Sequence, residues 1–226
     1  FKITVKRARR TIESDGAIRH AWHGVLEEIA LDLAEMYGDR LLLRIVPSRG
    51  SVHSAIGMPL RAHRDTWGSG IMAQVNWWLP LYPLEPSRTM LVWPDKFETP
   101  VANTSHEWDY GKLVAQRSGG TCNYPLLPVA RTSPSPRKAI AVLIQPGELL
   151  AFSGAHLHGS VRDDTGLSRF SLDTRTVWHK DITCGRGARN VDGATRRPHW
   201  EWFARLSNGA SLAVPRDGRS WPNATT

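Results

Sequence analysis

Three side chains in two short segments of the chain have the types and the spacing of metal ligands. In "AHRDTWG", residues 62–68, His63 and Asp65 lie two positions apart. On an extended segment such residues point to the same face, so an imidazole and a carboxylate there can reach one ion. A third ligand stands 93 residues after Asp65 in "GAHLHGS", where one leucine separates His156 from His158. Two histidines and one carboxylate on one side of a metal leave the opposite positions open, as in catalytic non-heme iron sites.

Spacing alone does not distinguish His156 from His158, because residues two apart on a strand point to the same side. The segment "PGELLAF", residues 146–152, predicts a turn followed by an apolar strand, and a later strand opens at Arg169. An arginine on a strand next to a metal-binding histidine can bind a carboxylate through two hydrogen bonds. A 2-oxo acid cosubstrate requires such a group.

The ordered segments "HRD", "PGELLAF", "HGS" and "SRFSLD" resemble the Fe(II)/2-oxoglutarate-dependent oxygenases, and within them the phytanoyl-CoA hydroxylase-like branch. The resemblance implies a double-stranded β-helix, which is a cupin-like jelly roll with the metal at one open end. It also implies Fe(II) as cofactor, with 2-oxoglutarate and O2 as cosubstrates. The implied reaction oxidises a small or medium-sized metabolite, with hydroxylation as the expected outcome, and releases succinate and CO2.

The resemblance also assigns the histidines. In this branch the distal histidine opens an "HGS"-like turn, and an arginine follows eleven residues later. His158 fits both features, because Ser160 and Arg169 stand at the corresponding positions. The implied cosubstrate ligands are Arg169 and Ser160, and the implied metal ligands are His63, Asp65 and His158.

Other residues near these motifs are candidates for ligand contacts. In "MAQVNWW", Gln74 and Asn76 share one face of a strand with Trp78, and the polar pair is expected to contact the cosubstrate if that face lines the cavity. The segment 85–97 lacks the "NG…PGSH" turn of many relatives, so no substrate contact is inferred from it. Because Asp65 is present, a halogenase, which needs that ligand position vacant, is disfavoured. The candidates for substrate contacts are Trp67, Trp78, His156 and His53.

The apolar pattern predicts a mainly β fold around these motifs. One amphipathic helix is expected from Ser14 or Asp15 to Gly38, packed on the barrel, and a last helix is expected from Pro198 to Gly209. Between them, short β-rich segments without intervening helices favour an antiparallel barrel or jelly roll. Strands are expected at 41–46, 51–56, 71–80, 89–93, 139–144, 148–152 and 168–178. We expect one domain over residues 1–226, with a long loop or flap at about 94–138.

Composition limits the partners. The net charge of +8, from 29 basic and 21 acidic residues, favours an anionic small-molecule substrate. No nucleic-acid-binding motif accompanies the basic residues, so nucleic acid is not an expected partner. No apolar run is long enough to cross a bilayer, so no membrane association is expected. With only Cys122 and Cys184, a reducing compartment is favoured, and a cytoplasmic location is expected.

Two other interpretations stay open. The segment "RFSLDTR" resembles the paired-arginine element of AlkB-like nucleic-acid demethylases, and the basic charge would suit that function. Six residues of strand separate Arg169 from Arg175 by about 20 Å, however, which is too far for both to hold one small carboxylate. The second interpretation is a non-catalytic cupin-like metal-binding protein, in which a fourth ligand such as His156 would close the site.

Overall fold

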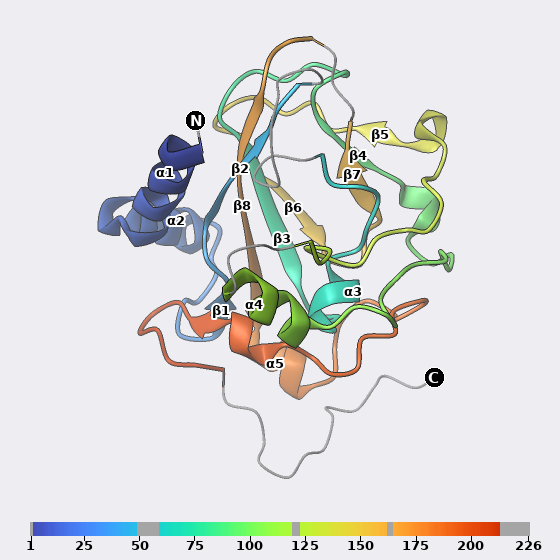
Figure 1. The fold of residues 1–226 in the computed structure, drawn as a ribbon. Helices are drawn as coiled ribbons and strands as arrows, with labels where there is room; N and C mark the ends of the chain where they lie inside the picture. The colour runs from blue at the N-terminus through green and yellow to red at the C-terminus, as the bar shows by residue number, and fades with distance from the viewer. Residues whose placement is uncertain (1, 49–58, 119–122, 162–164, 213–226) are drawn as a thin grey trace.

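The chain folds mainly into two antiparallel sheets (Figure 1), as seen in a computed structural model that describes residues 2–48, 59–118, 123–161 and 165–212. The larger sheet has the order β6-β3-β8-β1-β9, with β2 also paired to β8, and the smaller sheet has the order β5-β4-β7. The strands of the larger sheet are β1 (Met36–Gly38), β2 (Leu42–Val46), β3 (Val75–Pro80), β6 (Leu150–Ser153), β8 (Arg169–Trp178) and β9 (Ala204–Arg205). Those of the smaller sheet are β4 (Met90–Val92), β5 (Ile140–Ala141) and β7 (His158–Ser160).

This mainly antiparallel architecture is compatible with the predicted cupin-like jelly roll. Six of the seven expected strands are present, although several are shorter than the segments that predicted them. The expected strand at 51–56 lies outside the described residues. The strands β1, β7 and β9 were not predicted. Each has only two or three residues, which is too few to show the alternation of apolar and polar residues that identifies a strand.

The long strand β8 supplies the polar wall of the space between the sheets. Its odd-numbered residues from Arg169 to Arg175 share one face. In the neighbouring strand β3, Asn76 pairs with Arg175 and Trp78 pairs with Asp173. The other face of β8 is apolar at Phe170 and packs on the neighbouring strand β2 and the first helix. The alternation in "RFSLDTR" therefore separates a polar inner face from an apolar outer one.

Two helices, and not the single one expected, cover the outer face of the larger sheet. They are α1 (Lys2–Ser14) and α2 (Gly16–Glu28), drawn in dark blue in Figure 1. Val5 of α1 is buried in a cluster with Leu43 and Ile45 of β2. The expected helix start at Ser14 or Asp15 is confirmed for α2, because the side chain of Asp15 caps it by accepting hydrogen bonds from the backbone N–H groups of Ala17 and Ile18.

The predicted end of this helix at Gly38 is wrong. The α2 helix ends at Glu28, and Ala30 adopts a left-handed backbone conformation with φ of 63°. Met36, the last residue of the helical apolar spacing, and the two residues after it form β1, which pairs with β8 and β9 instead. Pairing within the sheet satisfies these backbone groups and overrides the local helical pattern.

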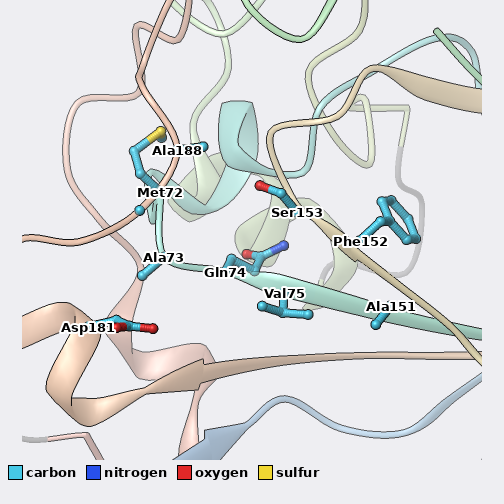
Figure 2. Close-up of a pocket in the computed structure, with 10 residues that line it drawn as sticks. Met72, Ala73, Gln74, Val75, Ala151, Phe152, Ser153, Asp181 and Ala188 are labelled. Carbon is cyan, nitrogen blue, oxygen red and sulfur yellow. The ribbon is translucent and has the colours of Figure 1, made fainter. Parts of the chain in front are cut away.

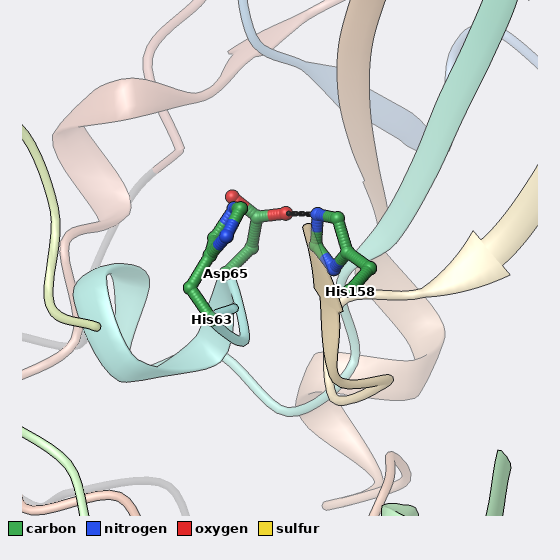
Figure 3. A group of neighbouring side chains, drawn as sticks. All are labelled: His63, Asp65 and His158. Atoms are coloured by element: carbon green, nitrogen blue, oxygen red, sulfur yellow. Dashed lines mark ion pairs between the residues drawn. The ribbon is translucent and has the colours of Figure 1, made fainter. Parts of the chain in front are cut away.

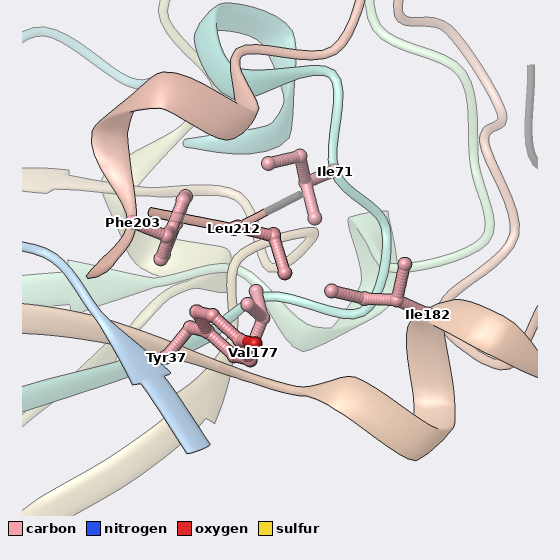
Figure 4. Close-up of a cluster of buried hydrophobic side chains, with 6 residues drawn as sticks. All are labelled: Tyr37, Ile71, Val177, Ile182, Phe203 and Leu212. Carbon is pink, nitrogen blue, oxygen red and sulfur yellow. The ribbon is translucent and has the colours of Figure 1, made fainter. Parts of the chain in front are cut away.

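The predicted helix from Pro198 to Gly209 is also wrong. A single 3-10 turn at Trp200–Trp202 is followed by β9, which pairs with β1. Phe203, at the junction, is 2% exposed and anchors the segment in a core at the end of the larger sheet (Figure 4). This cluster contains Tyr37, Ile71, Val177, Ile182, Phe203 and Leu212, of which Ile182 comes from α5 (His179–Thr183).

The segment 94–138 connects the strands β4 and β5 of the smaller sheet. It contains the 3-10 turns Pro94–Lys96 and Pro136–Lys138 and the helix α4 (Tyr110–Ser118). Its interpretation as a flap stays a prediction, as does the assignment of the whole chain to one domain. Among the described residues, none of the helices combines the length and the apolar character needed to span a bilayer.

Candidate metal centre

The three predicted metal ligands lie together (Figure 3). His63 and Asp65 precede the short helix α3 (Thr66–Ser69), and His158 opens β7. The backbones of His63 and His158 exchange hydrogen bonds of 2.8 and 2.9 Å, which brings their ring centres to 4.2 Å from each other. His158 Nε2 lies 3.5 Å from Asp65 Oδ2. One ligand atom from each residue lies within 4.8 Å of the other two, so the group could hold a metal ion.

Main-chain carbonyls fix the tautomers of both histidines. The Nδ1 of His63 lies 2.7 Å from the carbonyl oxygen of Arg61, and the Nδ1 of His158 lies 3.0 Å from that of His156. A carbonyl oxygen only accepts, so each Nδ1 carries a hydrogen and each neutral ring keeps a lone pair on Nε2. Metal-binding histidines commonly donate their second ring N–H in this way. Both rings are therefore set to bind a metal through Nε2.

Groups from β3 and β8 hold the carboxylate of Asp65. Asn76 donates from Nδ2 to Oδ2 at 2.5 Å, and Arg175 Nη1 lies 3.9 Å from Oδ1. Burial would raise the pKa of Asp65, but electrostatic interactions with His158, His63 and Arg175 and the Asn76 hydrogen bond outweigh burial and lower it. The carboxylate is thus kept ionised and held at both oxygens.

Arg175 is a supporting residue that the sequence connected only with the demethylase alternative. Its guanidinium forms an ion pair with Asp39 and lies 5.0 Å from the ring centre of Trp202. Alternation along β8 puts Arg175 on the same face as Arg169, and this signal could have identified it. The two arginines have different partners, since Arg175 is paired with acidic residues and Arg169 is not.

Arg169 and Ser160 join the two sheets next to the candidate metal ligands. Arg169 Nη2 donates to Ser160 Oγ at 3.2 Å, and Ser160 Oγ also accepts from the backbone N–H of Leu60 at 3.3 Å, so its hydroxyl hydrogen is left for a ligand. Arg169 is 4% exposed, and its Nε has no hydrogen-bond partner. Burial lowers the pKa of Arg169 to about 10, so the group is still a cation at neutral pH. A buried cation with a free donor is suited to bind a carboxylate.

His156 is placed outside the metal-ligand group of the described residues. Its ring packs on Phe97, with the ring centres 4.4 Å apart. Its contribution to the site comes from its main chain, because its carbonyl orients the ring of His158. A contact between the His156 side chain and a substrate stays a prediction.

The remaining candidates have different surroundings. Trp67 is fully buried in an apolar cluster and donates from Nε1 to Asp192 at 2.6 Å, so its ring has no exposed surface for a substrate. Trp78 is 3% exposed and lies against the guanidinium of Arg169, with 5.7 Å between its ring centre and Cζ. Gln74 and Asn76 contact each other and Asp65, and their contact with a cosubstrate stays a prediction. His53 lies outside the described residues.

Arg64, which stands between two of the candidate metal ligands, His63 and Asp65, was not identified from the sequence. Its side chain is 2% exposed and forms an ion pair with Asp192 at 3.1 Å. It also donates to the carbonyl oxygens of Lys96 at 2.5 Å, Thr99 at 3.1 Å and Ala155. No local pattern identifies Asp192 as the partner, because 128 residues separate the pair. Arg64 ties the ligand segment to the chain that follows β4.

We expect Arg64→Met to destabilise the protein by about 3–5 kcal/mol, because it leaves Asp192 as a buried, unpaired charge. Urea unfolding with a fluorescence readout measures this change. The control is Arg197→Ala, which removes an ion pair with Glu201 that is exposed on both sides and costs about 1 kcal/mol or less. Equal free energies of unfolding for the two variants would contradict this role of Arg64.

The metal-free protein is expected to lose stability as the pH falls below about 6.5. Burial, followed by the charge of His158, lowers the pKa of His63 to about 3. Between these values the unfolded chain binds a proton at His63 that the folded chain does not. The contribution of His63 to the free energy of unfolding is therefore fully present above pH 6.5, and it falls by about 1.4 kcal/mol per pH unit toward pH 3. Urea unfolding at several pH values should give a flatter dependence for His63→Gln, and identical slopes would refute the assignment.

No family model matches the chain, and no curated protein matches its sequence. Solved structures do match. The epimerase SnoN, in complex with Fe3+, alpha ketoglutarate and nogalamycin RO, aligns with a TM-score of 0.50 and 17% identity over 92% of this chain and 75% of SnoN. At this identity the likeness shows a shared fold.

Two further matches are weaker. EvdO2 from Micromonospora carbonacea var. aurantiaca, complexed with 2-oxoglutarate, aligns with a TM-score of 0.47 and 14% identity over 75% of this chain and 62% of EvdO2. The non-heme monooxygenase ThoJ aligns with a TM-score of 0.44 and 15% identity over 72% of this chain and 52% of ThoJ. The chain thus spans between half and two thirds of the length of these two proteins. Of these three structures, SnoN is the one described with both iron and alpha ketoglutarate, and the matches do not distinguish the phytanoyl-CoA hydroxylase-like branch.

Proposed function

We propose that the protein is an Fe(II)- and 2-oxoglutarate-dependent oxygenase that acts on a small or medium-sized metabolite. The observation that carries the proposal is the combination of two unlike sites. A triad of two imidazoles and one carboxylate lies next to the buried Arg169, whose Nε lacks a partner. A metal triad alone would suit several metals. The buried cation of Arg169, hydrogen-bonded to Ser160 in the same strand as His158, adds a place for the second carboxylate of a dicarboxylic cosubstrate.

The donor set fits the proposed metal. Two neutral imidazoles and one carboxylate on one side of an ion form the ligand set of non-heme Fe(II) oxygenases, in which the other positions stay open. Bound Fe(II) would supply the redox chemistry that couples oxidative decarboxylation of 2-oxoglutarate by O2 to oxidation of the substrate. The fold shared with SnoN, whose structure holds Fe3+ and alpha ketoglutarate, supports these ligands for this chain.

The chain's own residues would bind and orient. His63, Asp65 and His158 would hold the metal, while Asn76 and Arg175 keep the Asp65 carboxylate in one orientation. Arg169 and the Ser160 hydroxyl would bind the distal carboxylate of 2-oxoglutarate. The ring of Trp78 covers the Arg169 guanidinium and excludes water from that end, which strengthens a charged hydrogen bond there.

Hydroxylation in the phytanoyl-CoA hydroxylase-like manner is our proposal for the outcome, with succinate and CO2 as coproducts. Among the structural neighbours are an epimerase and a carbocyclase from nogalamycin biosynthesis, so the same fold serves other outcomes. We propose a metabolite of biosynthetic or specialised metabolism as substrate, with an anionic character suited to the net charge of +8. Nucleic acid is not part of the proposal.

The deciding experiment loads the protein anaerobically with Fe(II), adds 2-oxoglutarate, and measures succinate after exposure to air. Slow succinate formation is expected even without the metabolite, as an uncoupled reaction. Metal binding without 2-oxoglutarate binding or succinate formation would instead support the non-catalytic metal-binding protein. Stimulation by methylated single-stranded DNA or RNA, and by no small molecule, would support the demethylase.

A further inference from the structure

A chain of hydrogen bonds leads away from the metal-binding carboxylate, and its direction is fixed. The carboxylate of Asp65 only accepts, so its partner Asn76 must present its amide nitrogen to it. The amide oxygen of Asn76 then faces Gln74 and accepts from Nε2 of that residue at 2.7 Å. The orientation of both amides follows from the charge of Asp65, and no amide flip can satisfy all three groups. Gln74 therefore ends the chain with its oxygen, an acceptor.

This last acceptor has no partner. Gln74 is 1% exposed, and its Oε1 is buried without a hydrogen bond. Close packing holds the amide in place, because a Cβ added to Gly154 would lie 2.8 Å from Gln74 Nε2. A buried carbonyl oxygen without a donor is costly, and native proteins rarely leave one. A donor from outside the chain would remove that cost.

A pocket of about 380 Å³ adjoins this group (Figure 2). Its walls are largely apolar, formed by Met72, Ala73, Val75, Phe152 and Ala188. In Figure 2 the Gln74 amide lies between Ala73 and Ser153, with Met72 and Ala188 across from it. The volume falls within the range of pockets that bind small molecules.

The polar groups of the pocket define what it can bind. Asp181 lies at its edge, about one third exposed and 4.0 Å from Arg186, and brings a carboxylate. The Oγ of Ser153 accepts from the backbone N–H of Ala155 at 3.2 Å. The pocket thus has an unpartnered carbonyl acceptor in its wall and, at its edge, a carboxylate paired with Arg186. An anion is disfavoured there, and a hydrogen-bond donor is favoured.

We propose that this pocket binds a compact, largely apolar molecule that carries a hydroxyl or protonated amine, and that this group donates a hydrogen bond to Oε1 of Gln74. The site goes beyond the proposed oxygenase function, since binding there requires neither iron nor 2-oxoglutarate. Its occupant would be joined to Asp65 by the Gln74 and Asn76 hydrogen bonds. The site differs from the Arg169 region, where the free group is a cation.

The test uses the metal-free protein with 13C-labelled alanine methyl groups and three probes of nearly equal shape. The probes are benzyl alcohol, protonated benzylamine and benzyl methyl ether, of which the ether lacks a donor. NMR titration should shift the methyl signals of Ala73, Ala151 and Ala188, which line the pocket. The alcohol or the amine is expected to bind about fivefold or more tightly than the ether, as one hydrogen bond gives. The comparison of alcohol with amine identifies which donor the pocket prefers.

Two variants locate the effect. Gln74→Met keeps the length of the side chain but removes Oε1, so it should reduce the affinity for the donor probes to that for the ether. Ala188→Leu narrows the pocket and should abolish binding of all three probes, whereas Ala210→Leu, at an exposed position, should change nothing. Equal affinity of the unaltered protein for alcohol and ether, or no shift of these methyl signals, would overturn the proposal even if Gln74→Met did not fold. Because the probes are titrated without metal, neither result depends on oxygenase activity.

Discussion

The His158→Ala variant is expected to lose metal binding and succinate formation, whereas His156→Ala keeps both. In the proposed site His158 would supply one of three ligands through Nε2, so its loss should weaken Mn(II) binding by more than the 10- to 100-fold that is typical of supporting residues. His156 supports the site only through its carbonyl oxygen, which alanine retains. Its side chain packs on Phe97, so the substitution costs packing and leaves the orientation of the His158 ring intact.

Isothermal titration calorimetry with Mn(II), followed by the succinate assay with Fe(II), measures both variants. The pair is a matched control, because the two histidines are two residues apart in one segment. If His156→Ala loses metal binding and His158→Ala does not, the assignment of the distal ligand is wrong by two residues. Asp65→Ala should behave like His158→Ala, since it removes the carboxylate ligand.

Replacing Arg169 is expected to separate cosubstrate binding from metal binding. Arg169→Met removes a buried cation that would pair with the distal carboxylate of 2-oxoglutarate, a loss of about 2–5 kcal/mol or about 30-fold or more in Kd. Arg169→Lys should bind 2-oxoglutarate more tightly than Arg169→Met but less tightly than the unaltered protein, because an ammonium keeps the charge but cannot form the bidentate hydrogen bonds of a guanidinium. Mn(II) affinity should not change in either variant, since Arg169 does not belong to the ligand group.

Calorimetric titration of 2-oxoglutarate into the Mn(II)-loaded protein, under anaerobic conditions, gives these affinities. Arg197→Ala serves as the control for loss of an arginine, because its ion pair with Glu201 lies at the surface. If Arg169→Met bound 2-oxoglutarate as tightly as Arg197→Ala, the buried cation would have another role. A parallel loss of Mn(II) affinity would instead indicate that Arg169→Met disturbs the whole site.

The proximity of His63, Asp65 and His158, a group that could hold a metal ion, follows most directly from the sequence prediction. His63 and Asp65 are two residues apart, so the local backbone alone can direct both side chains to one side. The alternation of side chains along β3 and β8 places Asn76, Arg169 and Arg175 on the inner face. The strands could be recognised because their alternation is strong. Their pairing partners could not, because the register depends on residues far apart in the chain.

The errors have a common physical origin. The apolar helical spacing continues from Ile18 to Met36, but the helix ends at Glu28 and Met36 pairs with β8, because tertiary hydrogen bonds outweigh a local preference. The same holds near the C-terminal end, where burial of Phe203 and pairing of β9 replace the expected helix. The ion pair of Arg64 with Asp192 and that of Arg175 with Asp39 join distant segments, so nothing in the local sequence reveals them.

The position of Arg64 has a consequence for engineering the protein. Its guanidinium binds the backbone of residues 96–99 and the side chain of Asp192, while the residues on either side of it, His63 and Asp65, are the proposed metal ligands. A graft that exchanges the segment after β4 with that of a homologous enzyme would also replace the carbonyl groups that hold this arginine. Segments 94–101 and 185–195 are therefore best transplanted together with Arg64 as one unit. A library that varies either segment alone would select for repair of the metal site before it could select for a new substrate.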